Sequence, residues 1–430
     1  MACRKPLKAL NSSWQQAEHA DVRIEIVGGG MVGLAFAIAI KRSLPMAAVR
    51  VLEARALPSG APSPLDSRAT ALNLASRDIL DSWGIWSEIE ALGAAIKAIH
   101  VSSRGRFGSA VMEASDVGEL ALGYVVENHY IGAALLKLAE HDGVLLEAPA
   151  GVTGIDVSGP SPKLLRGTES PINADLVVVA DGADSPLCHH LGVMMARRNV
   201  GQRAVAANVR FEGTSVGTAW ERFTGHGPIA LLPLPDDVTG RQRYNLIWSM
   251  HPDEARAIED VADADFLDAL QRAVGWRLGR LTDVGRRTAW DLSRIAVREQ
   301  VRAGVVIAGN AAHTLHPVAG QGFNLSLRDA SRLAQTLTEA HAQDETFSSL
   351  PVLRRYESAV AKDQQETTRA TDFLATLFRS RGFLLNLPRD AALASLDFLY
   401  LYAEVLPGVV REKVWTLCMR QATDGVFGAC

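Results

Sequence analysis

The chain contains few cysteines. Cys3, Cys188, Cys418 and Cys430 are scattered along 430 residues, and no two of them form a CxxC pair. A disulfide framework, a redox cysteine pair or a zinc site built from clustered thiolates is therefore not expected, and no metal ligands are assigned. A reducing compartment such as the cytoplasm suits this composition.

The chain also lacks long apolar runs and a strong charge of either sign. No window reaches about 18 uninterrupted apolar residues, so no transmembrane helix is expected. The net charge of −4 does not favour nucleic acid as a partner. Residues 1–21 contain no apolar core of the kind a signal peptide needs, and we interpret them as a flexible extension. The 48% of hydrophobic residues is normal for a globular protein, and the length suggests more than one domain.

Residues 22–53 show the order strand, glycine turn, helix, strand. VRIEIV runs into GGGMVG, a helical apolar pattern follows, and VRVLE closes the segment. This order predicts a βαβ unit of a parallel sheet. Gly28, Gly30 and Gly33 have the GxGxxG spacing, which allows a tight turn, approach of a pyrophosphate, and close packing of helix on strand. Glu53 is placed to accept hydrogen bonds from a ribose, so the unit predicts dinucleotide binding.

A second apolar strand, DLVVVA at 175–180, ends in DGADS. There Asp181 can accept hydrogen bonds from ribityl or ribose hydroxyls, while Gly182 keeps the approach free of a side chain. This arrangement favours FAD. The alternative interpretation is an ordinary Asp-Gly turn after a strand.

A third strand, VVIAGN at 305–310, opens the segment AAHTLHPVAGQGFNLSLRDA. Gly320, Gln321 and Gly322 lead into a helical pattern, and a helix N-terminus presented by glycines favours negative charge. A reduced flavin carries such charge on its pyrimidine edge. Asn310, at the strand end, is expected to hydrogen-bond a ribityl hydroxyl.

Two histidines in this segment have two interpretations. His313 and His316 either are satisfied within the turn or contact the reacting ring.

Together these three blocks resemble the aromatic hydroxylase family of FAD-dependent monooxygenases, which has the p-hydroxybenzoate hydroxylase fold, over nearly the whole chain from residue 22. DSRATALNLAS (66–76) is similar to the family segment in which an arginine, here Arg68, lies against the flavin. Four segments resemble the ubiquinone-biosynthesis branch of the family. They are TLHPVAGQGFNL after Asn310, HVSSRGRFG, ERFTGHGPIALLP and GWRLGRL. The resemblance implies an α/β fold: a Rossmann-like FAD-binding domain with a parallel sheet, an inserted, mostly antiparallel substrate domain, and C-terminal helices.

The expected domains are discontinuous. RAVAANVRF, PIALLPLP and RYNLIWSM read as strands of the inserted domain, with one helix around 253–275. The assigned ranges are 22–98, 124–198 and 299–372 for the FAD-binding domain, 99–123 and 199–298 for the substrate domain, and 373–430 for a C-terminal helical segment.

The resemblance implies ring hydroxylation of a polyprenyl phenol in ubiquinone biosynthesis. FAD would be bound tightly, NAD(P)H would be a transient co-substrate, and dioxygen would react through a flavin hydroperoxide. Arg68, His316 and Pro317 are candidates for the flavin face, and no residue is assigned as the catalytic base. Asn128 occupies a place where the family contacts the ribityl chain, and its alternative role is a helix N-cap.

The resemblance also implies peripheral contact with the inner membrane from the cytoplasmic side, and it leaves open a biosynthetic complex and a homo-oligomer. The stretch after residue 373 is rich in Leu and Phe, with Arg379, Arg381 and Arg389 interspersed. Such a pattern suits an anionic membrane face, or else helices that pack on the FAD-binding domain or between subunits.

Two other functions remain open at this level. One is a reductase or hydroxylase of another aromatic on the same fold, and the other is a non-catalytic flavin-binding subunit. A soluble acid as substrate requires a fixed Arg or Lys within 199–250, whereas a prenyl tail requires an apolar wall. The segment PIALLPLP favours the apolar wall.

Overall fold

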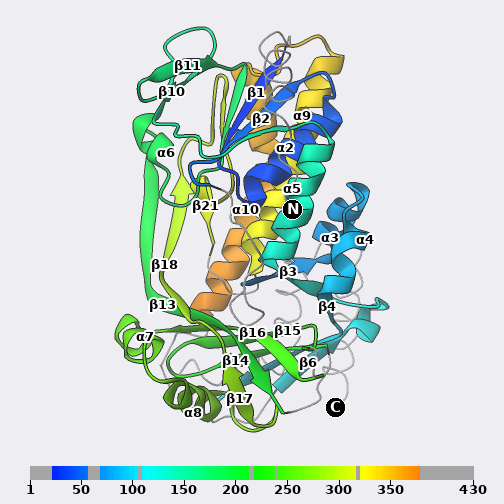
Figure 1. Ribbon diagram of the computed structural model, residues 1–430, viewed down its shortest axis with the longest axis vertical. Coiled ribbons are helices and arrows are strands. Elements are labelled where there is room, and N and C mark those ends of the chain that lie inside the picture. Colours follow the sequence, from blue (N-terminus) through cyan, green and yellow to red (C-terminus); the bar gives the residue numbers. More distant parts are fainter. Residues whose placement is uncertain are drawn as a thin grey trace, which may run out of the picture.

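The computed structural model describes residues 22–56, 68–104, 109–212, 217–237, 240–315 and 320–377. A six-stranded sheet with its helices occupies one end of the molecule, and a larger sheet with two helices occupies the other (Figure 1). The six strands, from edge to edge, are β19 (Val301–Arg302), β20 (Val305–Ile307), β12 (Leu176–Val179), β1 (Arg23–Val27), β2 (Ala48–Leu52) and β8 (Leu145–Glu147). All pairs are parallel except β19 with β20.

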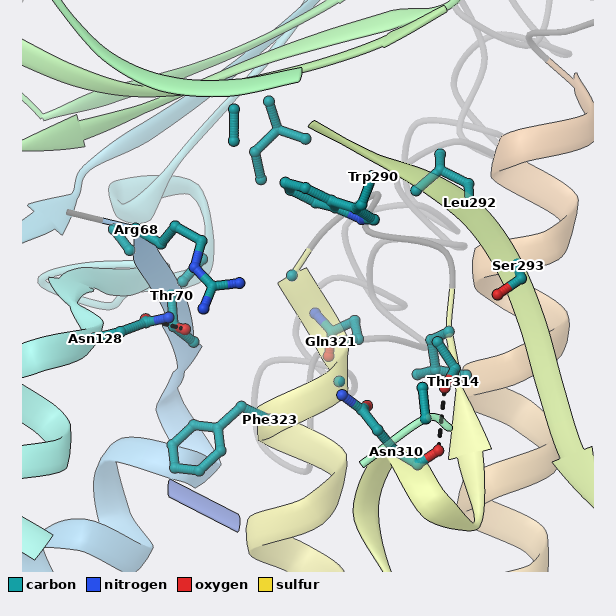
Figure 2. A pocket seen from close by; sticks show the side chains of 18 of the residues that line it. Arg68, Thr70, Asn128, Trp290, Leu292, Ser293, Asn310, Thr314, Gln321 and Phe323 are labelled. Atoms are coloured by element: carbon teal, nitrogen blue, oxygen red, sulfur yellow. Dashed lines mark hydrogen bonds between the residues drawn. The ribbon is translucent and has the colours of Figure 1, made fainter. Parts of the chain in front are cut away.

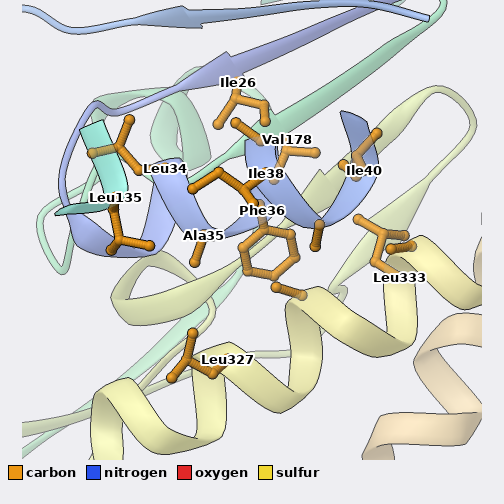
Figure 3. Close-up of a cluster of buried hydrophobic side chains, with 14 of the residues drawn as sticks. Ile26, Leu34, Ala35, Phe36, Ile38, Ile40, Leu135, Val178, Leu327 and Leu333 are labelled. Atoms are coloured by element: carbon orange, nitrogen blue, oxygen red, sulfur yellow. The ribbon is translucent and has the colours of Figure 1, made fainter. Parts of the chain in front are cut away.

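The central strands of this sheet are largely apolar on both faces because both faces are covered. The exception is the ion pair of Glu25 on β1 with Arg50 on β2 (2.7 Å). Ile26 and Val178 point toward the helices on one face, where Phe36 packs among side chains such as Leu327 (Figure 3). Val27 contributes to a separate cluster on the other face. The helices of the first face are α2 (Met31–Ser43), α5 (Asn128–His141), α9 (Gln321–Ala342) and α10 (Leu350–Leu377). The other face is covered by α6 (Pro186–His190) and by a small sheet of β9 (Gly154–Asp156), β10 (Lys163–Arg166) and β11 (Glu169–Asn173).

The larger sheet has nine strands, and its only parallel pair in the described part of the chain is β5 with β14. In order, its strands are β21 (His313–Thr314), β18 (Thr288–Val297), β13 (Met195–Phe211), β16 (Gln242–Met250), β15 (Pro228–Leu234), β14 (Thr218–Phe223), β5 (Ala98–Ser103) and β6 (Ser109–Glu113), with β17 (Leu281–Val284) paired to β13. The long strand β13 runs from the first body into this sheet (Figure 1). Helices α7 (Pro252–Glu259) and α8 (Asp263–Val274) pack on its outer face.

A three-stranded sheet lies between the two bodies. It consists of β3 (Ala69–Asn73), β7 (Gly123–Glu127) and β4 (Gly93–Ile96). The short elements α3 (Leu74–Ser82), α4 (Trp86–Ile89), η1 (Glu90–Leu92) and η2 (Ala114–Val117) connect to it, and η3 (Gly309–Ala311) follows β20.

The predicted α/β fold with a parallel sheet and a mostly antiparallel second sheet is confirmed. The single helix expected around 253–275 is wrong in detail, because α7 ends at Glu259 and α8 begins at Asp263. Asp260 leaves the helical conformation between them, and an acidic first turn starts the new helix. No helix in the described ranges is both long and apolar enough to cross a membrane. The extension 1–21 and the stretch after residue 377 lie outside the described residues.

Candidate functional site

The three sequence motifs meet at the carboxyl ends of neighbouring strands, β1, β12 and β20. A Cβ on Gly28 would lie 2.3 Å from the Ala180 carbonyl oxygen, so the first and second motifs are in direct contact. A Cβ on Gly309 would lie 2.7 Å from Cγ1 of Val32, so the third motif packs against the first turn of α2. The carboxyl edge of an open parallel sheet is the usual place for a nucleotide.

The glycines of the first motif have different surroundings. Gly28 has a φ of +114°, which disfavours any side chain there. A Cβ on Gly33 would lie 1.8 Å from the Gly28 carbonyl oxygen, so only glycine lets the helix approach the turn this closely. A Cβ on Gly30 would meet nothing within 4 Å, and Gly30 is the N-cap of α2 without a side-chain cap. Open space before uncapped N–H groups fits a pyrophosphate.

Glu53 closes β2 beside this turn. Its Oε2 accepts a hydrogen bond from Gly29 N (2.6 Å), and its Oε1 accepts one from Arg55 N (3.0 Å). A carboxylate has about four lone-pair positions, so two remain for hydroxyl donors. The residue predicted to meet the ribose is thus held in place by the glycine turn itself.

Asp181 has one satisfied and one unsatisfied oxygen. Its Oδ2 accepts a hydrogen bond from Ser185 Oγ (2.9 Å), whereas its buried Oδ1 has no hydrogen-bond partner among the described residues. Burial raises the pKa of the Asp181 carboxyl despite the hydrogen bond from Ser185. Gly182 has a φ of +100° and open space at its Cβ position. A buried acceptor without a donor is what a cofactor hydroxyl would satisfy, so the set fits FAD.

A cavity of about 770 Å³ lies between this edge and the nine-stranded sheet (Figure 2). Its wall includes Arg68 and Asn128 on one side and Asn310 on the other, with Gly320, Gln321 and Gly322 at the start of α9. The structure therefore brings these six predicted residues together. Gly28, Gly30, Gly33, Glu53, Asp181 and Gly182 lie outside the cavity wall.

Asn128 begins helix α5 but does not cap it. Its Oδ1 accepts a hydrogen bond from Thr70 Oγ1 (2.7 Å), and the N-cap position belongs to Glu127. The Asn128 N–H donates to the carbonyl oxygen of Arg68 (2.8 Å), which fixes β3 beside the helix. In Figure 2 the guanidinium of Arg68 and the amide of Asn128 lie on the same side of the cavity.

Asn324 is a positioning residue that the sequence interpretation missed. Its side chain is fully buried, and its Nδ2 donates to the carbonyl oxygens of Ala71 (2.8 Å) and Gly320 (2.9 Å). Its Oδ1 accepts from Asn73 N (3.0 Å). These bonds tie the start of α9 to strand β3. An asparagine on the apolar face of FNLSL is the signal that could have revealed it.

His313 pairs with a buried carboxylate. Its Nε2 lies 3.0 Å from Asp329 Oδ2, and the Asp329 side chain is 1% exposed. Gln364 Nε2 donates to the same oxygen (2.9 Å). His313 is not part of the cavity wall, which favours the satisfied-turn interpretation. His316 and Pro317 lie outside the described residues.

The described cavity wall offers no evident proton acceptor for a phenol. Its ionisable side chains are Arg68, Asp184, Arg197 and Asp291. Asp184 pairs with Arg197, and Asp291 pairs with Arg203 (3.0 Å). Three other ionisable side chains of the region 199–298 do not reach the wall: Tyr244 is fully buried against Phe211, His226 pairs with Glu254, and His251 caps α7.

Comparison with known proteins agrees with this geometry. Residues 21–367 match the family model described as FAD binding domain. The chain belongs to this family. It is 32% identical over 368 residues to 3-demethoxyubiquinol 3-hydroxylase of Escherichia coli, covering 85% of this chain and 90% of that protein. It is also 32% identical over 376 residues to ubiquinone hydroxylase UbiL of Rhodospirillum rubrum, covering 86% and 85%. The family and these relatives make the protein an FAD-dependent aromatic monooxygenase.

Solved structures share the fold. p-Nitrophenol 4-monooxygenase PnpA of Pseudomonas putida superimposes with a TM-score of 0.70 at 19% identity, covering 92% of this chain and 98% of that one. PqsL of P. aeruginosa, in complex with 2-aminobenzoylacetate, gives a TM-score of 0.70 at 18% identity, covering 87% and 99%. At this identity the likeness concerns the fold alone.

Proposed function

We propose that the protein hydroxylates the aromatic ring of a polyprenyl methoxyphenol in ubiquinone biosynthesis, as a 2-polyprenyl-6-methoxyphenol hydroxylase. NAD(P)H is the reductant and dioxygen is the second substrate. The relatives from Escherichia coli and Rhodospirillum rubrum carry names of ubiquinone-pathway hydroxylases, which supports the pathway. When bound, FAD would supply the redox and oxygen chemistry of the flavin-hydroperoxide type.

The side chains of the cavity wall favour a neutral prenyl phenol over a soluble aromatic acid as substrate. Between 199 and 250, the described residues that reach the cavity are neutral: Asn199, Ala206, Leu232, Asn245 and Ile247. Arg243 lies in the same range, but it is buried in an ion pair with Glu127 and is not part of the wall. A soluble aromatic acid would need a cation in this stretch of the wall to replace its hydration. The two cations of the described wall lie outside the stretch: Arg68 is on the Asn128 side, and Arg197 pairs with Asp184. Neutral and apolar side chains instead fit an uncharged phenol with a prenyl tail.

The chain's own residues would act by binding and positioning. The start of α2 and Asp181 would hold the nucleotide portion, and the start of α9 would place N–H groups against the negatively charged edge of a reduced flavin. Asn324 would keep that helix start against β3. Trp290 and Leu292, which line the far wall from β18, would exclude water from the reacting ring (Figure 2).

The test uses the purified full-length protein. We expect a flavin absorption spectrum, and we expect NAD(P)H oxidation coupled to a hydroxylated product with a short-chain prenyl methoxyphenol. 4-Hydroxybenzoate, a soluble acid, should give no product. A protein without bound flavin would refute the FAD assignment. NAD(P)H oxidation without hydroxylated product would favour a reductase or a scaffold subunit instead.

A pair of variants tests the wall. Leu232→Arg places a cation in the cavity and should lower kcat/KM for the prenyl substrate by about tenfold or more, roughly 1.4 kcal/mol of transition-state binding. Leu232→Met preserves the apolar wall and serves as the control. Equal activity of the two variants would contradict the proposed substrate position.

A further inference from the structure

Three neighbouring strands of the nine-stranded sheet form one part of the cavity wall. Ala206 on β13, Leu232 on β15 and Ile247 on β16 give this part an apolar surface. Its polar side chains are Asn199, which is exposed, and Asn245, which is buried. Asn245 lies opposite Leu232 in the pairing of β15 with β16, so it is set among the apolar side chains. A polar group placed in this way is the kind that fixes the orientation of a ligand.

The orientation of the Asn245 amide is fixed by a chain of hydrogen bonds that starts at a carboxylate. Glu127 pairs with Arg243 (2.8 Å), and its carboxylate can only accept hydrogen bonds. Asn208 therefore presents Nδ2 to Glu127 Oε1 (3.3 Å) and Oδ1 to Asn245, which lies opposite it in the pairing of β13 with β16. Asn245 in turn donates from Nδ2 to Asn208 Oδ1 (2.7 Å). The carboxylate thus sets the direction of both amides.

Asn245 consequently presents an amide oxygen to the cavity. Its Oδ1 accepts no hydrogen bond from the described residues and is open to the cavity. A half-turn of the amide would place this oxygen against Asn208 Oδ1, and the bond between the two side chains would be lost. Hydrogen bonds in such a chain also polarise one another, which makes the terminal oxygen a stronger acceptor.

We propose that Asn245 Oδ1 accepts a hydrogen bond from the ring hydroxyl of the substrate, and that Glu127 and Asn208 are positioning residues that hold the amide for it. The inference rests on the proposed function, because it takes a neutral prenyl phenol as the ligand of this cavity. Asn245 orients the ring and does not remove its proton, since an amide oxygen is not a base at neutral pH.

This contact would select rings that carry a free hydroxyl. A phenol or quinol can donate to Asn245 Oδ1. The oxygen of a quinone or of a methyl ether has no hydrogen to donate, so it would face the amide oxygen as a second acceptor and leave both without a partner. The cavity should therefore bind the reduced, unmethylated ring in preference to its quinone and its methyl ethers.

The test is equilibrium binding to the full-length protein with oxidised FAD and without NAD(P)H, followed by the change in flavin absorption. The ligands are a short-chain prenyl methoxyphenol and its O-methyl ether, which differ only in a methyl group that replaces the hydroxyl hydrogen. The wild type should bind the phenol about tenfold more tightly than the ether, or by a larger factor.

Two variants separate the acceptor from its orientation. Asn245→Leu removes the acceptor at similar size, so the phenol should bind about tenfold more weakly while the Kd of the ether stays unchanged. Asn208→Leu keeps Asn245 but frees its amide to turn an N–H toward an ether oxygen. The ether should then bind more tightly, and the ratio of the two Kd values should fall by about threefold or more. Retained binding of the ether also shows that each variant is folded.

Asn199→Leu is the matched control, because Asn199 lines the same wall but its Oδ1 already accepts from Gly201 N (2.7 Å). This variant should keep the wild-type ratio of Kd values. Equal binding of both ligands by the wild type, or a wild-type ratio in Asn245→Leu, would overturn the inference and leave the proposed function standing. An unchanged ratio in Asn208→Leu would refute the positioning role of the chain. A wild type that binds neither ligand would refute the proposed function, and the inference with it.

Discussion

Arg243 Nη2 lies 2.8 Å from Glu127 Oε1, with side-chain exposures of 7% and 4%. Glu127 ends β7 directly before Asn128, whereas Arg243 lies on β16 of the nine-stranded sheet. Asn208 Nδ2 donates to the same Glu127 oxygen (3.3 Å), and Asn245 Nδ2 donates to Asn208 Oδ1 (2.7 Å). Because Asn245 lines the cavity, a buried polar network connects the joint between the two bodies to the cavity wall.

Removing the cation from this network should be costly. Arg243→Met leaves the buried Glu127 carboxylate uncompensated, so we expect the free energy of unfolding to fall by about 3–5 kcal/mol. The double variant Glu127→Gln with Arg243→Met removes both charges while an amide oxygen still accepts from Asn208, and it should recover much of the loss. Urea unfolding measures both. A single variant as stable as the wild type would show that the pair does not stabilise the joint.

Substitution of two glycines of the first motif by alanine should change the free energy of unfolding by different amounts. Gly33→Ala places a Cβ 1.8 Å from the Gly28 carbonyl oxygen and forces helix and turn apart. We expect a loss of about 1–3 kcal/mol in unfolding free energy. Gly30→Ala has open space, and its effect on stability should stay below about 1 kcal/mol. Unfolding of the flavin-free protein compares the two, and similar losses would contradict the packing role of Gly33.

Gly30 should matter for the cofactor instead. Gly30→Val puts a branched side chain where the pyrophosphate is expected, and FAD should bind about tenfold more weakly or worse, a change of at least roughly 1.4 kcal/mol. Gly225→Val is the matched control, because Gly225 also has open space but lies between β14 and β15 in the nine-stranded sheet, away from the glycine motif. Titration of the flavin-free protein with FAD, followed by flavin fluorescence, gives both affinities. Full FAD affinity in Gly30→Val would refute the pyrophosphate assignment.

The local parts of the site could be predicted from the sequence because their causes are local. The contact of Gly33 with Gly28, and the hydrogen bond from Gly29 to Glu53, arise within one βαβ unit. Spacing and residue type predict the close packing at Gly33, whereas for Glu53 they predict only a contact with a ribose and not the bond to Gly29. The position of Asp181 just after strand β12 could also be predicted, because an apolar strand followed by an Asp-Gly turn is a local pattern.

Contacts between distant segments could not be predicted in this way. Asn324 bonds to Ala71 across more than 250 residues, and no local pattern encodes that distance. Trp290 lies on β18, where exposed and half-buried residues interrupt the alternation that marks a strand. The Glu127–Arg243 pair likewise depends on how two sheets meet.

Asp181 should give a measurable pH dependence. Burial raises its carboxyl pKa above the ordinary value of 3.8, so the folded flavin-free protein disfavours the ionised form. Stability relative to Asp181→Asn should therefore fall as pH rises from 3.8 through the raised pKa, and it should be insensitive to pH below that window. With FAD bound, a hydroxyl donated to Oδ1 should stabilise the carboxylate and reduce this difference.

The measurement is the unfolding free energy against pH for both proteins, with and without FAD. Ser185→Ala removes the hydrogen bond to Oδ2 and should widen the window in the flavin-free protein. Parallel curves for the wild type and Asp181→Asn would show that the carboxyl does not titrate differently on folding. If FAD changed the unfolding free energy of the wild type and of Asp181→Asn equally at every pH, a hydroxyl contact at Asp181 would be contradicted.

His313 should affect stability more than flavin binding. His313→Ala removes one of the two side chains that contact the buried Asp329 oxygen, leaving Gln364, and should lower the unfolding free energy by about 1–3 kcal/mol. FAD affinity should change little, because His313 is not part of the cavity wall. Gln364→Ala removes the other contact, from a helix that contributes no residue to the described cavity wall, and is the matched control. If His313→Ala kept full stability but lost flavin reduction by NAD(P)H, the histidine would have to act on the ring and not on Asp329.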